Sequence, residues 1–223
     1  MTSAPNKTAQ RLFAPIAPTY EKWARILSLG QDGKWRDAMV HGLALAKGAK
    51  VLDVAAGTGS ITRRLQAMGC DVVALDISED MLERHPGPER VLARAEALPF
   101  DDDTFDALTF GYLLRYVEDP VSCLAELARV VRPGGSLGMV EFGLPTGVWK
   151  TPWAIYSGLL LPLAGRLVSQ GWYDVGRFLR HSIEDFHRRY PNPADLWREA
   201  GLVDVVEKNL SLRGGLVTWG RKP

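Results

Sequence analysis

A glycine-rich turn placed directly after a short apolar run constrains the fold of this chain more than any other feature. The apolar run 51–54 leads into the turn 55–60, which reads AAGTGS, and apolar residues at helical spacing follow it. Glycines let a backbone approach a ligand closely and leave its N–H groups free, so such a strand–turn–helix unit is a general nucleotide-binding device. Taken alone, the unit is equally compatible with a tight turn that holds no ligand.

The same alternation of strand-like and helix-like segments continues along most of the chain, which is typical of parallel α/β proteins. The predicted strands are 51–54, 71–76, 90–93, 105–110, 136–142, 202–206 and 215–219. The segment 132–135, Arg-Pro-Gly-Gly, is predicted to turn the chain into the fifth strand. We therefore predict an α/β fold with a doubly wound, Rossmann-like, seven-stranded sheet that is mostly parallel and has an antiparallel last strand.

Two segments lie outside this alternation. Residues 1–46 carry apolar residues at mostly helical spacing, which predicts an N-terminal helical region ahead of the sheet. Residues 146–190 include an apolar stretch rich in Trp and Tyr, which we interpret as a helical insertion before the last two strands. A chain of 223 residues buries one substantial core, and we expect a single domain over residues 1–223.

Two aspartates beside the glycine turn narrow the choice of ligand. Asp53 lies at the end of the first strand, and Asp76 ends the second strand roughly twenty residues beyond the first glycine. An acid at the second position suits the two hydroxyls of a ribose, which NAD and S-adenosylmethionine share. A carboxylate at Asp53 would repel a pyrophosphate but attract the ammonium and sulfonium of S-adenosylmethionine. Thr62 replaces the third glycine of the dinucleotide fingerprint, so S-adenosylmethionine is the predicted cofactor, with solvated strand ends as the alternative for both acids.

Several motifs resemble those of a known enzyme family. The runs 53–59 (DVAAGTG), 74–78 (ALDIS) and 95–100 (AEALPF) resemble the successive motifs of class I methyltransferases. More narrowly, the chain resembles the ubiquinone/menaquinone biosynthesis C-methyltransferases over nearly its whole length. The segments that carry this closer likeness are 13–20, 28–36, 132–135, 141–142 and 182–186.

The resemblance implies an S-adenosylmethionine-dependent methyltransferase and suggests its site residues. Those expected to contact the cofactor are Asp53, Ala55, Gly57, Thr58, Gly59, Asp76, Ile77 and Ala95. Arg115 is expected to stabilise an oxyanion on the acceptor, directly or through a water, with Tyr20 as a hydrogen-bonding partner. An ion pair of Arg115 with Glu118 or Asp119 is the structural alternative. No metal is expected, because the histidines and cysteines lack metal-ligand spacing.

The implied acceptor is a small hydrophobic molecule, and the family points to a prenylated, demethylated quinol such as demethylmenaquinol, methylated at carbon. Four positions depart from the family pattern: Ala24, Arg94, Tyr116 and His187. Because these departures fall near the expected acceptor, O-, N- or C-methylation of another small hydrophobic acceptor stays open. A non-catalytic cofactor-binding protein and an NAD-linked oxidoreductase are further alternatives, the latter disfavoured by Asp53 and Thr62.

Charge balance and the apolar stretch bear on partners and location. Lys plus Arg number 27 and Asp plus Glu number 26, so no nucleic-acid partner is expected. The apolar run 150–166 is too short, and too interrupted by Pro and Gly, to span a bilayer. We expect a cytoplasmic protein of undetermined oligomeric state. Its apolar stretch either packs as core, roofs the acceptor, or makes peripheral contact with the inner face of the membrane.

Overall fold

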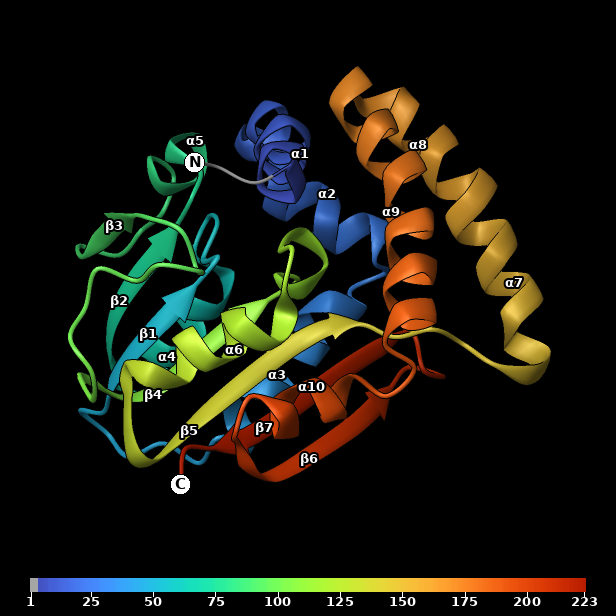
Figure 1. Ribbon diagram of the computed structural model, residues 1–223. Helices are drawn as coiled ribbons and strands as arrows, with labels where there is room; N and C mark the ends of the chain where they lie inside the picture. The colour runs from blue at the N-terminus through green and yellow to red at the C-terminus, as the bar shows by residue number, and fades with distance from the viewer. Residues whose placement is uncertain (1–3) are drawn as a thin grey trace.

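Seven strands form one sheet in the computed structural model, which describes residues 4–223 (Figure 1). The strands are β1 (Lys50–Val54), β2 (Asp71–Asp76), β3 (Arg90–Leu92), β4 (Phe105–Gly111), β5 (Val131–Phe142), β6 (Val203–Leu210) and β7 (Gly215–Arg221). Their order is β3-β2-β1-β4-β5-β7-β6. Strands β1 to β5 pair in parallel, and β7 is antiparallel to both of its neighbours. The predicted fold class is confirmed, including the antiparallel last strand.

Helices cover both faces of this sheet. The helices are α1 (Ala4–Phe13), α2 (Tyr20–Leu27), α3 (Gln31–Gly42), α4 (Ser60–Ala67), α5 (Glu79–Leu82), α6 (Pro120–Arg129), α7 (Lys150–Ile155), α8 (Leu161–Val168), α9 (Gln170–Arg189) and α10 (Pro193–Glu199). The shorter turns are η1 (Ala14–Thr19), η2 (Leu114–Tyr116), η3 (Gly147–Trp149) and a π-helical turn, η4 (Tyr156–Leu160). As predicted, helices precede the sheet, and a helical insertion precedes the last two strands.

The apolar runs of the sequence form two cores, one on each face of the sheet. On one face, Met39 of α3 and Leu65 of α4 pack with Val51 of β1. On the other face, Leu124 of α6 and Trp197 of α10 pack in a cluster that includes β4. Strands buried on both faces read as continuous apolar runs, which explains why the central strands were predictable from sequence.

Strand β5 differs from its prediction at its beginning. The segment 132–135 was expected to be a turn that precedes the strand, whereas β5 already begins at Val131. Phe105 of β4 pairs with Val131, and the next pair is Ala107 with Ser136, so the Arg-Pro-Gly-Gly segment is an irregularity inside the strand. Gly134 has a φ of 75°, which an L-residue adopts only at a cost, and its N–H donates to the Lys222 carbonyl at 2.9 Å.

Helices α7 and α8 project from one edge of the molecule, and α8 packs along α9 (Figure 1). The contact with α9 is close, because a Cβ on Gly165 would lie 2.5 Å from the Trp172 carbonyl oxygen. Seven large apolar side chains of residues 148–167 are exposed, and we call them the apolar row: Val148, Trp149, Ile155, Leu159, Leu160, Leu163 and Leu167. None of the helices in residues 4–223 has both the length and the apolar content that crossing a membrane requires.

Candidate functional site

The glycine turn after β1 has the backbone conformation that glycine favours. Gly57 has a φ of 56° and Gly59 a φ of 85°. A Cβ on Gly59 would lie 2.6 Å from Cδ of Pro86, so close packing also requires glycine there. A Cβ on Gly57 would meet only the sulfur of Met81, at 4.0 Å, because this glycine faces a cavity. The turn therefore keeps its backbone open to a ligand at Gly57 and is held from behind at Gly59.

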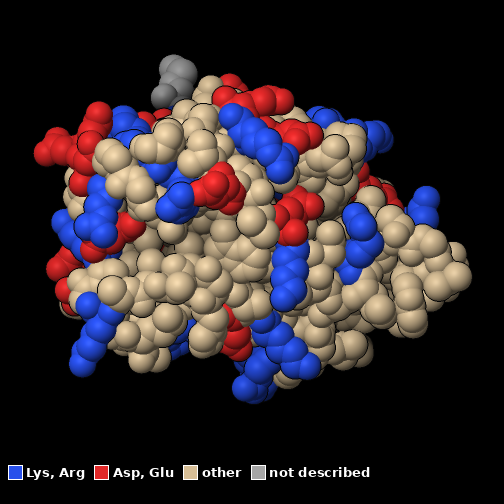
Figure 2. All heavy atoms as spheres, turned by 90° about the horizontal axis from the view of Figure 1, so that it is seen from below, with Lys and Arg blue, Asp and Glu red and all other residues tan. Residues whose placement is uncertain are grey.

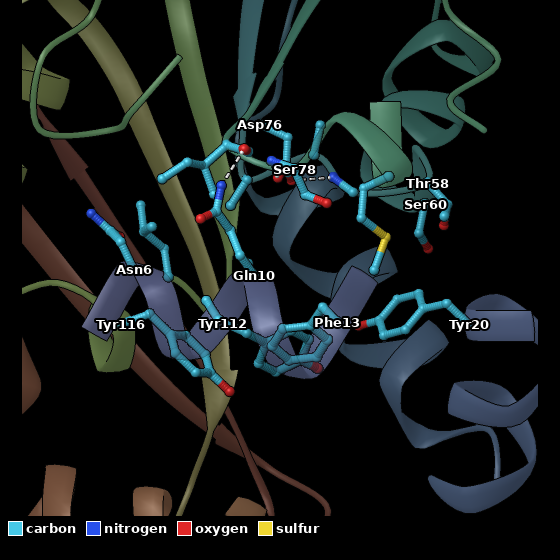
Figure 3. Close-up of a pocket in the computed structure, with 18 of the residues that line it drawn as sticks. Asn6, Gln10, Phe13, Tyr20, Thr58, Ser60, Asp76, Ser78, Tyr112 and Tyr116 are labelled. Carbon is cyan, nitrogen blue, oxygen red and sulfur yellow. Dashed lines mark hydrogen bonds between the residues drawn. The ribbon is translucent and has the colours of Figure 1, made fainter. Parts of the chain in front are cut away.

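Asp76, the last residue of β2, is held beside this turn by backbone donors. Its Oδ2 accepts the N–H of Gly57 and its Oδ1 accepts the N–H of Ser78, each at 2.8 Å (Figure 3). Burial raises the pKa of Asp76, against the effect of these backbone hydrogen bonds. Each carboxylate oxygen retains acceptor capacity, so the group can receive the two hydroxyls of a ribose.

A cavity opens at the carboxyl ends of β1, β2 and β4, where α/β proteins bind their ligands. Its lining includes Tyr20, Ala55, Gly57, Thr58, Asp76 and Ile77. A smaller hollow beside it shares Ala55 and Asp76 and is also lined by Ala95 and Leu113. The hollow offers a mostly apolar slot next to the carboxylate of Asp76.

Helix α1 covers this cavity. Gln10 donates to the carbonyl of Ile77 at 2.9 Å, and Asn6 donates to Glu96 at 2.7 Å. Figure 3 shows Asn6 and Gln10 projecting from the helix toward the loop that carries Asp76. The helix thus closes the cavity over the ends of the strands and reduces its contact with water.

The arrangement fits S-adenosylmethionine on three counts: a carboxylate for the ribose, a slot for the base, and a glycine turn without a side chain in the way. Of the residues predicted to bind the cofactor, Ala55, Gly57, Thr58, Asp76 and Ile77 line the cavity and Ala95 lines the adjoining hollow. Gly59 and Asp53 do not line either of them. Gly59 shapes the turn instead.

Asp53 is fully buried beneath the turn rather than facing the cavity. Its Oδ2 accepts the Thr62 hydroxyl at 2.6 Å and its Oδ1 accepts the Thr109 hydroxyl at 3.0 Å. Burial raises its pKa to about 6. Thr62, noted in the sequence only as a missing glycine, thus supplies a hydroxyl that this carboxylate needs. A negative charge on Asp53 can act on a bound cation only through the electric field, without contact.

Thr62 also connects Asp53 to a histidine. The Nε2 of His85 lies 3.0 Å from the Thr62 hydroxyl, and the N–H of Gly87 donates to Nδ1 of His85 at 3.0 Å. Because Nδ1 accepts a hydrogen bond, Nε2 carries the proton of the neutral ring and donates to Thr62. Burial lowers the pKa of His85, which favours this neutral form.

Arg115 lies next to the cavity but does not line it. Its Nε is 2.9 Å from Oε1 of Glu141, and its side chain is only 2% exposed. A second guanidinium nitrogen donates to Ser182 at 2.7 Å and lies 3.5 Å from the hydroxyl of Tyr116, which does line the cavity. The partner is therefore neither Glu118 nor Asp119, which was the structural alternative. Asp119 instead caps α6, accepting from the backbone N–H groups that begin this helix.

Arg36 and Asp32 of α3 were not singled out from the sequence, yet Arg36 lines the cavity. Nε of Arg36 lies 3.0 and 2.9 Å from the two oxygens of Asp32, one helical turn earlier. The hydroxyl of Tyr112 donates to Asp32 at 2.5 Å. Tyr20 belongs to the same group of side chains, and burial raises its pKa to about 12. The signals in the sequence were their place in the family-like segment 28–36 and the i, i+4 spacing of an acid and a base, which many surface helices share.

Comparison with known proteins identifies similar chains. The model of the ubiE/COQ5 methyltransferase family matches residues 1–221. A demethylmenaquinone methyltransferase of Renibacterium salmoninarum is 39% identical over 219 residues, covering 94% of this chain and 89% of that protein. One of Mycobacterium sp. (strain JLS) is 40% identical over 212 residues, covering 92% of this chain and 89% of that protein.

Solved structures of lower identity share the fold. A SAM-dependent methyltransferase of Thermotoga maritima, described as a possible histamine N-methyltransferase, is 17% identical with a TM-score of 0.67 and covers 96% of this chain and 99% of its own. A phosphoethanolamine N-methyltransferase of Haemonchus contortus, solved with S-adenosylmethionine, is 12% identical with a TM-score of 0.61 and covers 85% of this chain and 52% of its own. At such identities the likeness concerns the architecture alone.

Proposed function

Because the chain belongs to the ubiE/COQ5 methyltransferase family, we propose that it C-methylates a demethylated quinol such as demethylmenaquinol. Family membership makes it an S-adenosylmethionine-dependent methyltransferase, which confirms the predicted enzyme class and cofactor. The observation that carries the quinol proposal is the cavity, which has a ribose-binding carboxylate at one end and the aromatic rings of Phe13, Tyr20, Tyr112 and Tyr116 at the other. A flat aromatic acceptor suits such an end.

The cofactor supplies a methyl group that is activated by its bond to a positively charged sulfur. In our proposal Asp76 accepts the ribose hydroxyls, and Ile77 and Ala95 contact the base. Gly57 and Thr58 lie against the remainder of the molecule, where Gly57 leaves room for it. The chain's part in catalysis is then alignment of the two reactants in a space that α1 shields from water.

The acceptor must react in its reduced form, because a quinol that has lost a phenolic proton carries extra electron density on the neighbouring ring carbon. Tyr20 lines the aromatic end and is the proposed hydrogen-bonding partner of the acceptor. Its raised pKa keeps its hydroxyl protonated and hence a donor near neutral pH. Arg115 is proposed as a positioning residue, because it reaches the cavity through Tyr116.

Peripheral contact with a membrane also belongs to this proposal, since a prenylated quinol resides in lipid. The apolar row, which runs from η3 to α8, is its candidate surface, with Leu167 91% and Val148 83% exposed. Residues 143–173 contain no Asp or Glu but include Lys150 and Arg166, a charge pattern that suits anionic lipid. Figure 2 shows both signs of charge interspersed over the face seen from below, whereas the projection at its right edge is mostly tan.

The test is incubation of the purified protein with methyl-labelled S-adenosylmethionine and a panel of reduced demethylquinones, read by mass spectrometry. The proposal expects label on a ring carbon of demethylmenaquinol and none when the same quinone is left oxidised. Label that appears only on oxygen or nitrogen of other small acceptors would assign a different methyl acceptor. Cofactor binding without any product would make the protein a non-catalytic binder.

A further inference from the structure

Arg36 is the one positive charge at the cavity. Among the described residues that line it, only Asp76 and Arg36 are charged, and Asp76 already has a role at the ribose end. Arg36 lies with the aromatic rings of Tyr20 and Tyr112 and is 6% exposed. Burying a cation is costly unless it is paired, so a buried arginine at the wall of a cavity is a candidate for recognition of negative charge.

The guanidinium is fixed in place from several sides. Asp32 binds its Nε through both carboxylate oxygens and is itself bound by the Tyr112 hydroxyl. The guanidinium carbon lies 5.1 Å from the centroid of the Tyr112 ring. A Cβ on Gly111 would lie 3.5 Å from a terminal nitrogen of Arg36, so the guanidinium reaches from α3 to the end of β4. Such a held cation loses little freedom when it binds a ligand.

Charges around Arg36 keep it protonated. Burial alone would lower the pKa of Arg36, but the carboxylate of Asp32 outweighs burial and the pKa stands above its ordinary value. Burial alone would raise the pKa of Asp32, but Arg36, Tyr112 and Arg64 outweigh it and the pKa lies below its ordinary value. Neither group is a suitable base near neutral pH, so an electrostatic role remains.

We propose that Arg36 stabilises the phenolate oxygen of the acceptor, with Asp32 and Tyr112 as the residues that position it. This inference rests on the proposed function and names the group of this chain that makes the quinol reactive. The aromatic rings of this cavity favour an aromatic acceptor, because Tyr112 lies beside the guanidinium of Arg36 and Phe13 lies edge-on to both Tyr20 and Tyr116, at 6.1 and 5.6 Å between ring centroids. Figure 3 shows Phe13, Tyr112 and Tyr116 close together on the side of the cavity covered by α1.

The step balances without an oxidant or a metal. The phenolic proton leaves to water, and the electron pair that stays on oxygen is held by Arg36 and shared with the adjacent ring carbon. That carbon bonds the methyl group, while the electron pair of the broken carbon–sulfur bond stays on sulfur. The ring then loses the hydrogen of the methylated carbon to water as a second proton and becomes aromatic again. Arg36 keeps its proton throughout.

The first experiment measures ionisation of a bound phenol, without methyl transfer. 1-Naphthol is titrated by ultraviolet absorption in the presence of the wild type, R36Q, R36K and R132Q, each saturated with S-adenosylhomocysteine. Arg132 is a matched control, because it lies at the opposite ends of the strands, is 60% exposed and pairs with Asp106. We expect wild type and R132Q to lower the pKa of bound naphthol, and R36Q to raise it again by at least about one unit, a tenfold change in ionisation constant. Equal pKa values with wild type and R36Q would overturn the inference.

The second experiment separates this role from binding of the cofactor's own carboxylate. We expect R36Q to lower kcat by about 10² to 10³, as removal of a donor to an oxyanion does, with R36K in between. Calorimetry should show S-adenosylmethionine affinity within about threefold of the wild type. A parallel loss of affinity and kcat would assign Arg36 to the cofactor instead. If R36Q does not fold, R36K, which keeps the charge, decides between these outcomes.

Failure of the proposed function is recognisable separately. A wild-type protein that does not methylate demethylmenaquinol contradicts the acceptor, whatever the naphthol titration shows. A wild type that methylates it, with R36Q equally active, contradicts only the role of Arg36.

Discussion

Asp53 and Asp76 lie at the carboxyl ends of neighbouring strands, yet the structure gives them opposite environments. Asp76 faces the cavity and is held by backbone N–H groups, whereas Asp53 lies below the turn and is held by two threonine hydroxyls. The sequence could not distinguish them, because each simply ends an apolar run. The hydrogen-bond donors around each carboxylate make the difference. One donor to Asp53, Thr109, comes from a neighbouring strand 56 positions away in the sequence.

The raised pKa of Asp53 predicts a specific pH dependence of stability. The ordinary pKa is 3.8 and the folded value is about 6, so the folded state holds the proton over a range in which the unfolded state has lost it. Stability from this group is therefore greatest at low pH and falls as pH rises through about 6, by up to about 3 kcal/mol. Urea unfolding measures the free energy of unfolding of the wild type and of D53N. We expect D53N to become more stable relative to the wild type as the pH rises from 4 to 7. A constant difference would contradict the prediction.

Arg115 gives a second prediction for a single residue. Its partner Glu141 is fully buried, so R115M would leave an unpaired buried carboxylate and destabilise the protein by about 3–5 kcal/mol. The double variant R115M/E141L should recover most of that loss, and chemical denaturation measures both. In the milder R115K, turnover should fall while S-adenosylmethionine affinity stays nearly unchanged. Equal losses of turnover and affinity would place Arg115 at the cofactor.

Among the elements, α1 is the one whose role was least visible in the sequence. Its Gln10 bonds the carbonyl after Asp76, which ties the helix over the cavity. Removing one hydrogen bond costs about 0.5–1.5 kcal/mol, so Q10A should weaken S-adenosylmethionine binding by roughly three- to tenfold in calorimetry. Q170A is the matched control, because Gln170 bonds only the exposed Asp174 on α9 in the described structure. If Q10A and Q170A changed the affinity for S-adenosylmethionine equally, α1 would have no role in cofactor binding.

The strands and the glycine turn were predictable because their signals are local. An apolar run such as 71–76 predicts a buried strand from its own residues. A positive φ at Gly57 favours glycine whatever surrounds it. The environment of Arg115 was not predictable, since Glu141 and Ser182 lie 26 and 67 positions away. The place of Arg36 in the site was not predictable for the same reason. Arg36 lines the cavity only because α2 and β4 lie next to α3 in the fold.

For the molecule as a whole, the apolar row predicts association with lipid. L163E/L167E should bind vesicles that contain anionic phospholipid at least several-fold less than the wild type in a sedimentation assay, because two charges enter the proposed membrane-binding surface. V206E is the control, since Val206 is also exposed but lies on β6. Methylation of a short-chain quinol in detergent-free buffer should be unchanged. Equal vesicle binding by the wild type and L163E/L167E would show that the apolar row is not the lipid-binding surface.

The position of β7 has a consequence for biosynthesis. This strand follows β6 in the sequence but lies between β5 and β6 in the sheet. While the chain is still emerging from the ribosome, β5 and β6 therefore each have an unpaired edge, which residues 215–221 occupy in the folded protein. A nascent chain stalled before Gly215 leaves both edges unpaired at once, so we expect these edges to need shielding until residues 215–221 have been made.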